Sequence, residues 1–543
     1  MRDFARLTMP APPSAAAPCP APPRSVAATA VSSNNATTTL SAPALSGPAA
    51  RLRGRLLTTR RLVKNLEEES RAFAGAALRR VGLERRHAPA PLFEPVPFDV
   101  RPFPHRAGDR IEGSDDAEEL RAIVATPAGD ACMHTFFDVC PISPSGRYLA
   151  VTRLPFEHRG PWPGDMAEVC LVDLCAWTIQ AVYRTSGWAL QLGANLQWHP
   201  TSDILYTNDL KVEPRGYRGV GVAIDPADRS CRRYDAPFYA VDPSGRFMLG
   251  PALDLVNRTQ YGYGVPEGLF GRRRLARGAA GDEGIWRTDL ESGRVELLAS
   301  IADLVDASPA RALLRSGVNY LFHTKIAPCG GRLFQVLRSI DLADRPGAVR
   351  SRIMTLDTDG GHVREALPHE AWDRGGHHPS WLADGDILMN LVPDSVPETA
   401  AEGMRFVRIA QDGSGSPEPI GPWRGSGHPS VDPTGRFLVT DAYLNEGFGA
   451  PDGRAPLRLI DLAGGRERHV LQLDCGPPNL RARRVDPHPV WGRDGRSLIL
   501  NTVIDGRRQV VIADLGDRID RPPGERPTDP PSPATPGVSS DVG

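Results

Sequence analysis

Residues 428–441, HPSVDPTGRFLVTD, decide the fold because variants of this phrase occur seven times along the chain. In most copies Pro or Asp opens a turn, Gly takes the position that needs a positive φ, and an apolar strand leaves the turn. Each copy therefore predicts a β-hairpin. The other six copies are CPISPSGRYLAVTR at 140, LQWHPTSDILYTND at 196, YAVDPSGRFMLGPA at 239, TKIAPCGGRLFQVLR at 324, HPSWLADGDILMNL at 378 and HPVWGRDGRSLILN at 488.

Several copies are followed by a second pair of strands, in which an apolar run turns through Gly or a polar pair and returns. Examples are AEVCLVDLCAWTIQAVY at 167, DEGIWRTDLESGRVELL at 282 and SRIMTLDTDGGHVREAL at 351. Two hairpins per repeat make a four-stranded sheet, and repetition of such sheets around a ring leaves few unpaired edges. We therefore predict an all-β fold, a seven-bladed β-propeller over residues 110–516.

The two ends of the chain differ from the repeats in composition. Residues 1–50 are rich in Ala and Pro and predict a disordered tail. Residues 51–90 carry apolar positions at i, i+3 and i+4 among charged ones, which predicts a short N-terminal helical segment. Residues 517–543 are rich in proline and predict a second disordered tail.

Charge and cysteine content limit the possible partners. The 543 residues include 64 Lys+Arg and 65 Asp+Glu, so a net charge of -1 provides no global attraction to nucleic acid or to a membrane. An acidic ligand would have to be held locally. The 8 cysteines form no CxxC pair, which favours a reduced, cytoplasmic location. No apolar run reaches the ~18 residues that a membrane-spanning helix needs.

Four histidines occupy the same place in four consecutive repeats, just before the turn: His323, His378, His428 and His488. Equivalent positions on successive blades lie at similar radii, so these side chains should converge on the central channel. A single histidine in that place is more often structural. Several imidazoles at one opening favour a metal site. Asp486 lies two residues before His488, so both side chains should leave the strand on one face.

The phrases around these residues resemble those of the oligogalacturonate lyases, the propeller lyases of polysaccharide lyase family 22. The family's catalytic histidine phrase is similar to GGHHPSWLADG, with His378 three residues before Trp381. Its metal-binding histidine is similar to His428 in GSGHPSVDPTGR, and its closing phrase is similar to RRVDPHP, which ends just after His488. A family arginine corresponds to Arg352 in RSRIMTLDTDG.

This resemblance implies a metal-dependent lyase that cleaves an acidic, uronate-containing oligosaccharide by β-elimination. It implies that His378 is the catalytic base, that Arg352 holds the acid group of the sugar, and that His428 and His488 bind the metal. The family's other closing histidine is Asp486 here, and a carboxylate ligand favours a harder divalent ion, Mn²⁺ above all.

Three further residues are expected at the substrate. The family's closing glutamine is Arg483 here, which cannot ligate a metal but can clamp a carboxylate. We assign substrate binding to Arg483, His323 and Arg338.

The residues also fit a uronate elimination chemically. The step removes a weakly acidic proton beside a carboxylate, which a bound cation assists by neutralising that carboxylate. His378 would need a neutral ring within about 3 Å of the proton. His377 beside it points the other way along an extended chain and is interpreted as a structural or rim residue.

Other functions are less well supported by the sequence. No G-x-S-x-G elbow with an α/β domain follows the repeats, and no P-loop occurs. A non-catalytic propeller that serves as a binding or scaffold module is the alternative, and the sequence leaves the oligomeric state open. The insertion at 257–278, NRTQYGYGVPEGLFGRRRLARG, is expected to be an exposed loop rather than a lid. Trp188 and Trp198 are expected in the core.

Overall fold

The computed structural model describes residues 94–105, 120–213, 216–267, 273–342, 347–396, 403–450, 452–476, 484–516 and 519. The predicted tail at 1–50, the helical segment at 51–90 and almost all of the tail at 517–543 lie outside these residues. None of the described helices is long and apolar enough to cross a membrane.

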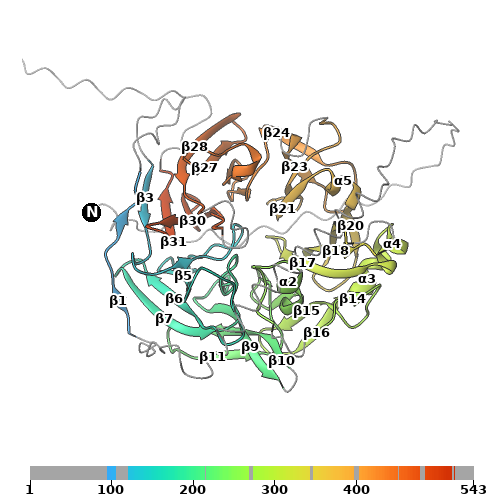
Figure 1. Cartoon of the computed structure of the whole chain (residues 1–543), viewed down its shortest axis with the longest axis horizontal. Helices are drawn as coiled ribbons and strands as arrows, with labels where there is room; N and C mark the ends of the chain where they lie inside the picture. The colour runs from blue at the N-terminus through green and yellow to red at the C-terminus, as the bar shows by residue number, and fades with distance from the viewer. Residues whose placement is uncertain are drawn as a thin grey trace, which may run out of the picture.

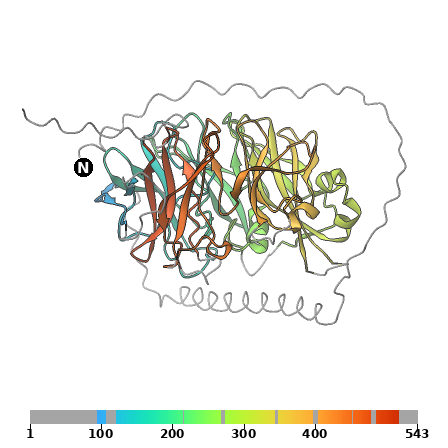
Figure 2. The same cartoon turned by 90° about the horizontal axis from the view of Figure 1, so that it is seen from above.

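Seven small antiparallel sheets stand around a central channel and form a seven-bladed β-propeller, as the repeated phrase predicted (Figure 1). Seen from the side, the strands run between the two faces of the ring (Figure 2). The seven blades are numbered from the N-terminal end, in chain order.

The first three blades contain these strands, listed from the channel outward. Blade 1 has β4 (Cys132–Met133), β5 (Tyr148–Arg153), β6 (Ala167–Asp173) and β7 (Thr178–Thr185), with β1 (Val96–Pro97) at its outer edge. Blade 2 has β8 (Gln197–Trp198), β9 (Leu205–Glu213), β10 (Gly216–Ile224) and β11 (Cys231–Tyr234). Blade 3 has β12 (Ala240–Val241), β13 (Phe247–Gly250), β15 (Gly284–Asp289) and β16 (Val295–Ser300).

The next three blades carry most of the histidines. Blade 4 has β17 (Val318–Ile326), β18 (Arg332–Ile340), β19 (Val349–Asp357) and β20 (Arg364–Leu367), with β14 (Ala276–Arg277) paired to β17. Blade 5 has β21 (Gly376–Trp381), β22 (Ile387–Leu391), β23 (Arg405–Ile409) and β24 (Glu418–Arg424). Blade 6 has β25 (Ser430–Val431), β26 (Phe437–Thr440), β27 (Ala455–Asp461) and β28 (Arg466–Leu473).

Blade 7 closes the ring by combining strands from both ends of the chain. Its inner strands are β29 (Val490–Trp491), β30 (Ser497–Ile504) and β31 (Arg507–Asp514). The fourth strand is β3 (Arg121–Val124), whose Val124 pairs with Val511 of β31, and β2 (Arg101–Pro102) lies outside it. Separation of the ends would therefore expose the edge of β31.

Short helices connect or cover the blades. They are α2 (Leu253–Thr259) in the insertion of blade 3, α3 (Ile301–Ala307) and α4 (Arg311–Ser316) between blades 3 and 4, α5 (His369–Asp373) before blade 5, and the 3-10 helix η2 (Leu444–Glu446) in blade 6. Ser300 begins α3 with a capping box, because its hydroxyl accepts from the amide of Asp303 while the Asp303 carboxylate accepts from the amide of Ser300.

The core lies between blades. In β27, Leu459 packs with Leu500 of blade 7, whereas its neighbour Ile460 packs with Phe406 of blade 5. Successive side chains of a strand point to opposite faces, so a sheet covered on both sides needs apolar residues in succession. This explains why the repeats read as continuous apolar runs. Trp188 and Trp198 are buried core residues, as expected.

Side-chain amides on the second strand of some blades bind the segment next to the inner strand of the following blade. The Asn390 amide donates to the carbonyl of Gly427 at 2.8 Å. The Asn501 carbonyl accepts from the amide of His134 at 2.9 Å. These bonds satisfy backbone groups next to the short inner strands and hold in place the segments that line the channel.

Candidate functional site

The channel-facing histidines lie on a backbone distortion that recurs between blades. His323, His378 and His488 have φ values of 58°, 58° and 48°, in the left-handed region, and β21 shifts register between His377 and Ser380. In blade 6 the left-handed residue is Gly427, at φ 68°, just before His428. A bulge of this kind turns a side chain away from the regular alternation, here toward the channel. A left-handed non-glycine costs roughly 1–2 kcal/mol, which the surrounding blades offset.

The three predicted metal ligands meet at one point. One ligand atom from each of His428, Asp486 and His488 lies within 4.8 Å of the others, and all three side chains are buried. Oδ2 of Asp486 and both ring nitrogens of His488 have no hydrogen-bond partner among the described residues. Buried polar atoms without partners are costly, and two imidazoles with one carboxylate are a common donor set for a divalent cation. These residues therefore fit a divalent cation.

A second layer of contacts orients these ligands. The Asp441 carboxylate accepts the backbone N–H of His428 at 2.6 Å and lies 2.9 Å from its Nδ1. Nδ1 of His428 therefore carries the hydrogen, and Nε2 keeps its lone pair. Arg484 donates from Nε to Oδ1 of Asp486 at 2.6 Å, which leaves Oδ2 of that carboxylate for a cation.

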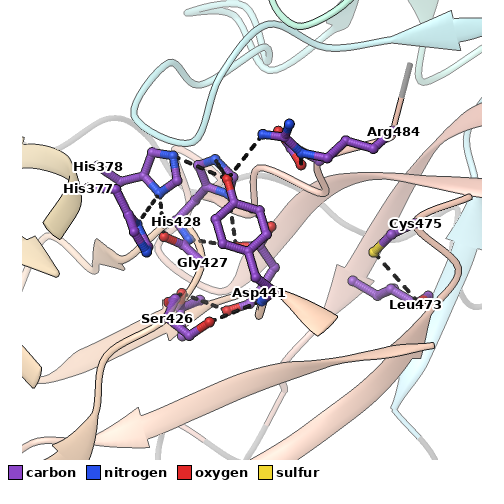
Figure 3. Close-up of polar contacts among 12 residues, drawn as sticks. His377, His378, Ser426, Gly427, His428, Asp441, Leu473, Cys475 and Arg484 are labelled. Atoms are coloured by element: carbon purple, nitrogen blue, oxygen red, sulfur yellow. Dashed lines mark hydrogen bonds and ion pairs between the residues drawn. The ribbon is translucent and has the colours of Figure 1, made fainter. Parts of the chain in front are cut away.

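His378 lies beside this cluster, close to His428 (Figure 3). Its ring centroid is 3.8 Å from that of His428, and its Nδ1 is 2.7 Å from the carbonyl oxygen of Gly427. Nδ1 therefore donates, and Nε2 is the basic nitrogen. Burial, together with the neighbouring His428 and His377, holds the pKa of His378 well below its usual value. A neutral ring with a fixed tautomer is what a general base requires.

Contrary to the sequence prediction, His377 does not point away from His378, because the left-handed φ of His378 breaks the strand alternation and brings the two rings together. Its Nε2 lies 3.0 Å from Oε1 of Glu446, and its Nδ1 lies 2.7 Å from Nδ1 of His378. The Asn390 amide also donates to Nδ1 of His377 at 3.2 Å, so this nitrogen is an acceptor. The remaining oxygen of Glu446 accepts from the hydroxyl of Ser426 at 2.5 Å.

The fourth histidine of the predicted ring, His323, does not join the metal cluster. The ring of Phe136 lies between them, with centroids 5.4 Å from His323 and 4.6 Å from His488. His323 instead hydrogen-bonds through Nδ1 to the hydroxyl of Tyr239. Burial and the nearby Lys325 keep the pKa of His323 well below its usual value.

Arg352 was expected to hold the acid group of the sugar, but it forms a buried ion pair inside blade 4. It is fully buried in β19, with Nε 3.1 Å from Oε2 of Glu365 on β20. Arg458 and Glu467 repeat this pair on the third and fourth strands of blade 6, at 2.7 Å. The order of motifs along the chain had suggested a site residue, but it does not fix which strand of a blade carries it. This arrangement identifies Arg352 as a packing residue.

Among the residues assigned to substrate binding, Arg338 is the arginine that lies within the described residues. It lies on β18, donates from NH1 to Oε1 of Gln260 at 2.7 Å, and covers the ring of Phe322. Its charge also acts on His323. Arg483 lies outside the described residues, and the neighbouring Arg484 is the cation at Asp486.

Several site residues were missed by the sequence analysis. Tyr443 places its hydroxyl 3.3 Å from Nε2 of His378 and 3.5 Å from Nε2 of His428. Burial and the charge of Asp486 raise the pKa of Tyr443 well above its usual value. The only signal for Tyr443 and Asp441 was the polar phrase DAY, which follows the apolar strand of blade 6.

A segment of blade 1 and the insertion of blade 3 also reach the site. Phe137 packs against His378 and His428, and His134 is buried beside His488. Tyr263, expected in an exposed loop, is buried with its ring 6.0 Å from that of His323. The insertion thus folds inward at this residue, because its aromatic ring packs with those of Phe136 and Phe322.

Comparison with known proteins supports the fold. No protein-family model and no curated protein sequence matches the chain. Among solved structures, an oligogalacturonate lyase in complex with manganese is similar, with 14% identity, a TM-score of 0.52, and coverage of 79% of this chain and 99% of that one. The oligogalacturonate lyase from Vibrio parahaemolyticus gives 12% identity, a TM-score of 0.52, and coverage of 78% and 99%. At these identities the likeness establishes a shared propeller fold.

Proposed function

We propose that this protein is a metal-dependent lyase that cleaves an acidic, uronate-containing oligosaccharide by β-elimination. The observation that carries the proposal is the buried cluster of His428, Asp486 and His488 beside the neutral base His378. Oδ2 of Asp486 and both ring nitrogens of His488 have no hydrogen-bond partner within the described parts of the chain. The similar structure described as an oligogalacturonate lyase in complex with manganese agrees with this choice of chemistry and metal.

The roles of the residues follow from their positions. His428, Asp486 and His488 would hold a divalent cation, Mn²⁺ being the expected one, which when bound neutralises the sugar carboxylate and makes the adjacent C–H more acidic. His378 removes that proton at Nε2 while Gly427 holds its other nitrogen. Arg338, rather than Arg352, supplies a guanidinium that can grip a carboxylate in a bidentate way.

Two measurements test the proposal. The purified protein should contain about one divalent ion per chain, as expected for a single three-ligand site. His488→Ala should lose that ion. His362→Ala should retain it, because His362 is an exposed residue of an outer hairpin that binds Asp357.

The metal-loaded protein should then release unsaturated products, detected by their ultraviolet absorbance, from uronate oligosaccharides. A metal-loaded protein that leaves every uronate intact would contradict the proposal. The structure would then be better explained as a non-catalytic binding or scaffold propeller.

A further inference from the structure

Tyr443 lies at the point where the base and the metal ligands meet. It follows β26 and begins η2, and its hydroxyl oxygen is 3.3 Å from Nε2 of His378 and 3.3 Å from NH2 of Arg484. Arginine can only donate, so Arg484 donates to the Tyr443 oxygen. Two acceptors face the Tyr443 hydroxyl, His378 Nε2 at 3.3 Å and His428 Nε2 at 3.5 Å. The lone pair of His428 would hold the cation, so the Tyr443 hydrogen is assigned to His378 Nε2. A proton donor, the Tyr443 hydroxyl, thus contacts the proposed base, Nε2 of His378.

We propose that Tyr443 gives its proton to the departing sugar oxygen, so that the elimination is syn and selects uronates with the C5 hydrogen and the C4 oxygen on the same side of the ring. This inference rests on the proposed lyase function. It goes beyond that function because it assigns the proton donor and narrows the class of sugar, away from the galacturonate that the similar oligogalacturonate lyase is named for.

The step balances without water or an oxidant. His378 Nε2 takes the C5 proton, the C5–H electron pair forms the C4=C5 double bond, and the C4–O4 bond breaks with its electrons on O4. O4 then takes the proton of Tyr443. The Tyr443 oxygen, held by Arg484, recovers a proton from the His378 imidazolium across the 3.3 Å contact. The site returns to its starting state after each turnover.

The separation of the two groups determines the stereochemistry. A base and a donor each need to approach within about 3 Å of the atom they serve, so groups on opposite faces of a sugar ring stand roughly 6 Å apart or more. The 3.3 Å between His378 and Tyr443 fits two groups on one face. The same reasoning relates the spacing of catalytic carboxylates to stereochemical outcome in glycosidases.

This geometry favours two of the four common uronates, glucuronate and mannuronate. In glucuronate and mannuronate the C5 hydrogen and the C4 oxygen are on the same side, whereas in galacturonate and guluronate they are on opposite sides. We expect kcat/KM to be about 100-fold or more higher for glucuronate- or mannuronate-linked oligosaccharides than for galacturonate- or guluronate-linked ones. This ratio is the penalty that misalignment of a reacting atom imposes.

The substrate experiment uses the full-length, Mn²⁺-loaded protein and four size-matched oligosaccharides, one for each uronate, with unsaturated product as the readout. Preference for the glucuronate or mannuronate substrate supports the inference. Preference for galacturonate or guluronate overturns it and leaves the lyase proposal standing. No product from any of the four overturns both.

The donor role is tested with Tyr443→Phe. On the preferred oligosaccharide we expect kcat to fall by about 10²–10⁴-fold, the contribution of a positioned proton donor. On a uronate with a nitrophenolate leaving group, which departs without protonation, the loss should largely disappear, whereas the loss in His378→Ala should persist. Tyr148→Phe, on β5 of blade 1, is the matched control. Tyr443→Phe with a kcat within about threefold of the parent, or an equal loss on both substrates, overturns the donor role.

Discussion

Asp441 should control metal affinity without touching the metal. Its carboxylate is buried, accepts the backbone N–H of His428 and faces Nδ1 of the same ring at 2.9 Å. In Asp441→Asn, the side-chain NH₂ can replace the carboxylate oxygen that accepts the hydrogen from Nδ1 of His428. The ring would then shift its hydrogen to Nε2, the nitrogen that should face the cation.

We expect Asp441→Asn to bind Mn²⁺ about 10–100-fold more weakly, the usual effect of removing a partner that orients a metal ligand. This loss corresponds to about 1.4–2.7 kcal/mol of binding free energy. Isothermal titration of the metal-free protein with Mn²⁺ near pH 7 measures it directly.

Asp357→Asn is the matched control, because Asp357 also binds Nδ1 of a histidine, His362, but on an exposed outer hairpin. The reasoning is refuted if Asp441→Asn binds Mn²⁺ as tightly as the parent protein, or if Asp357→Asn weakens binding equally.

The proposed catalytic base, a buried ion pair and a buried neutral histidine can each be tested separately. His378→Ala should keep its metal, measured by elemental analysis, while kcat on the preferred uronate falls by about 10²–10⁴-fold; loss of the metal would contradict the separate role of the base. Arg352→Ala should lower the free energy of unfolding by about 3–5 kcal/mol in urea, because it leaves the buried Glu365 carboxylate with the Ser308 hydroxyl but without its counter-charge. Arg352→Met combined with Glu365→Leu should be nearly neutral. A stable Arg352→Ala protein without activity would restore the role in substrate binding. Burial lowers the pKa of His134 to about 3, so the folded state binds fewer protons at this ring than the unfolded state, whose pKa is about 6.5. The stability that this neutral ring provides is therefore present above about pH 6.5 and lost as the pH falls toward about 3. In metal-free protein, the free energy of unfolding in urea should fall less steeply with decreasing pH for His134→Gln than for the parent. An equal pH dependence of the two proteins would contradict this.

The sequence determined the propeller because each blade must repeat the same solution. A turn residue with positive φ, an apolar strand and a return strand are local requirements, so they recur as a readable phrase such as HPSVDPTGRFLVTD. The same repetition indicated His428 and His488, which precede the inner strands of two adjacent blades at equal radii. Asp486 followed from its place two residues before His488.

The remaining parts of the site depend on contacts between segments that are distant in sequence, which no repeat encodes. His323 has the same local phrase as the others, but Phe136 from blade 1 separates it from the cluster. Arg352 and Arg338 lie on neighbouring strands of one blade, and only the pairing of Arg352 with Glu365 showed which of them is committed to packing. Tyr443 became visible as a site residue only once folding brought its hydroxyl to His378. Side-chain direction and inter-blade packing, which tertiary structure alone decides, thus determined which of the polar residues belong to the site.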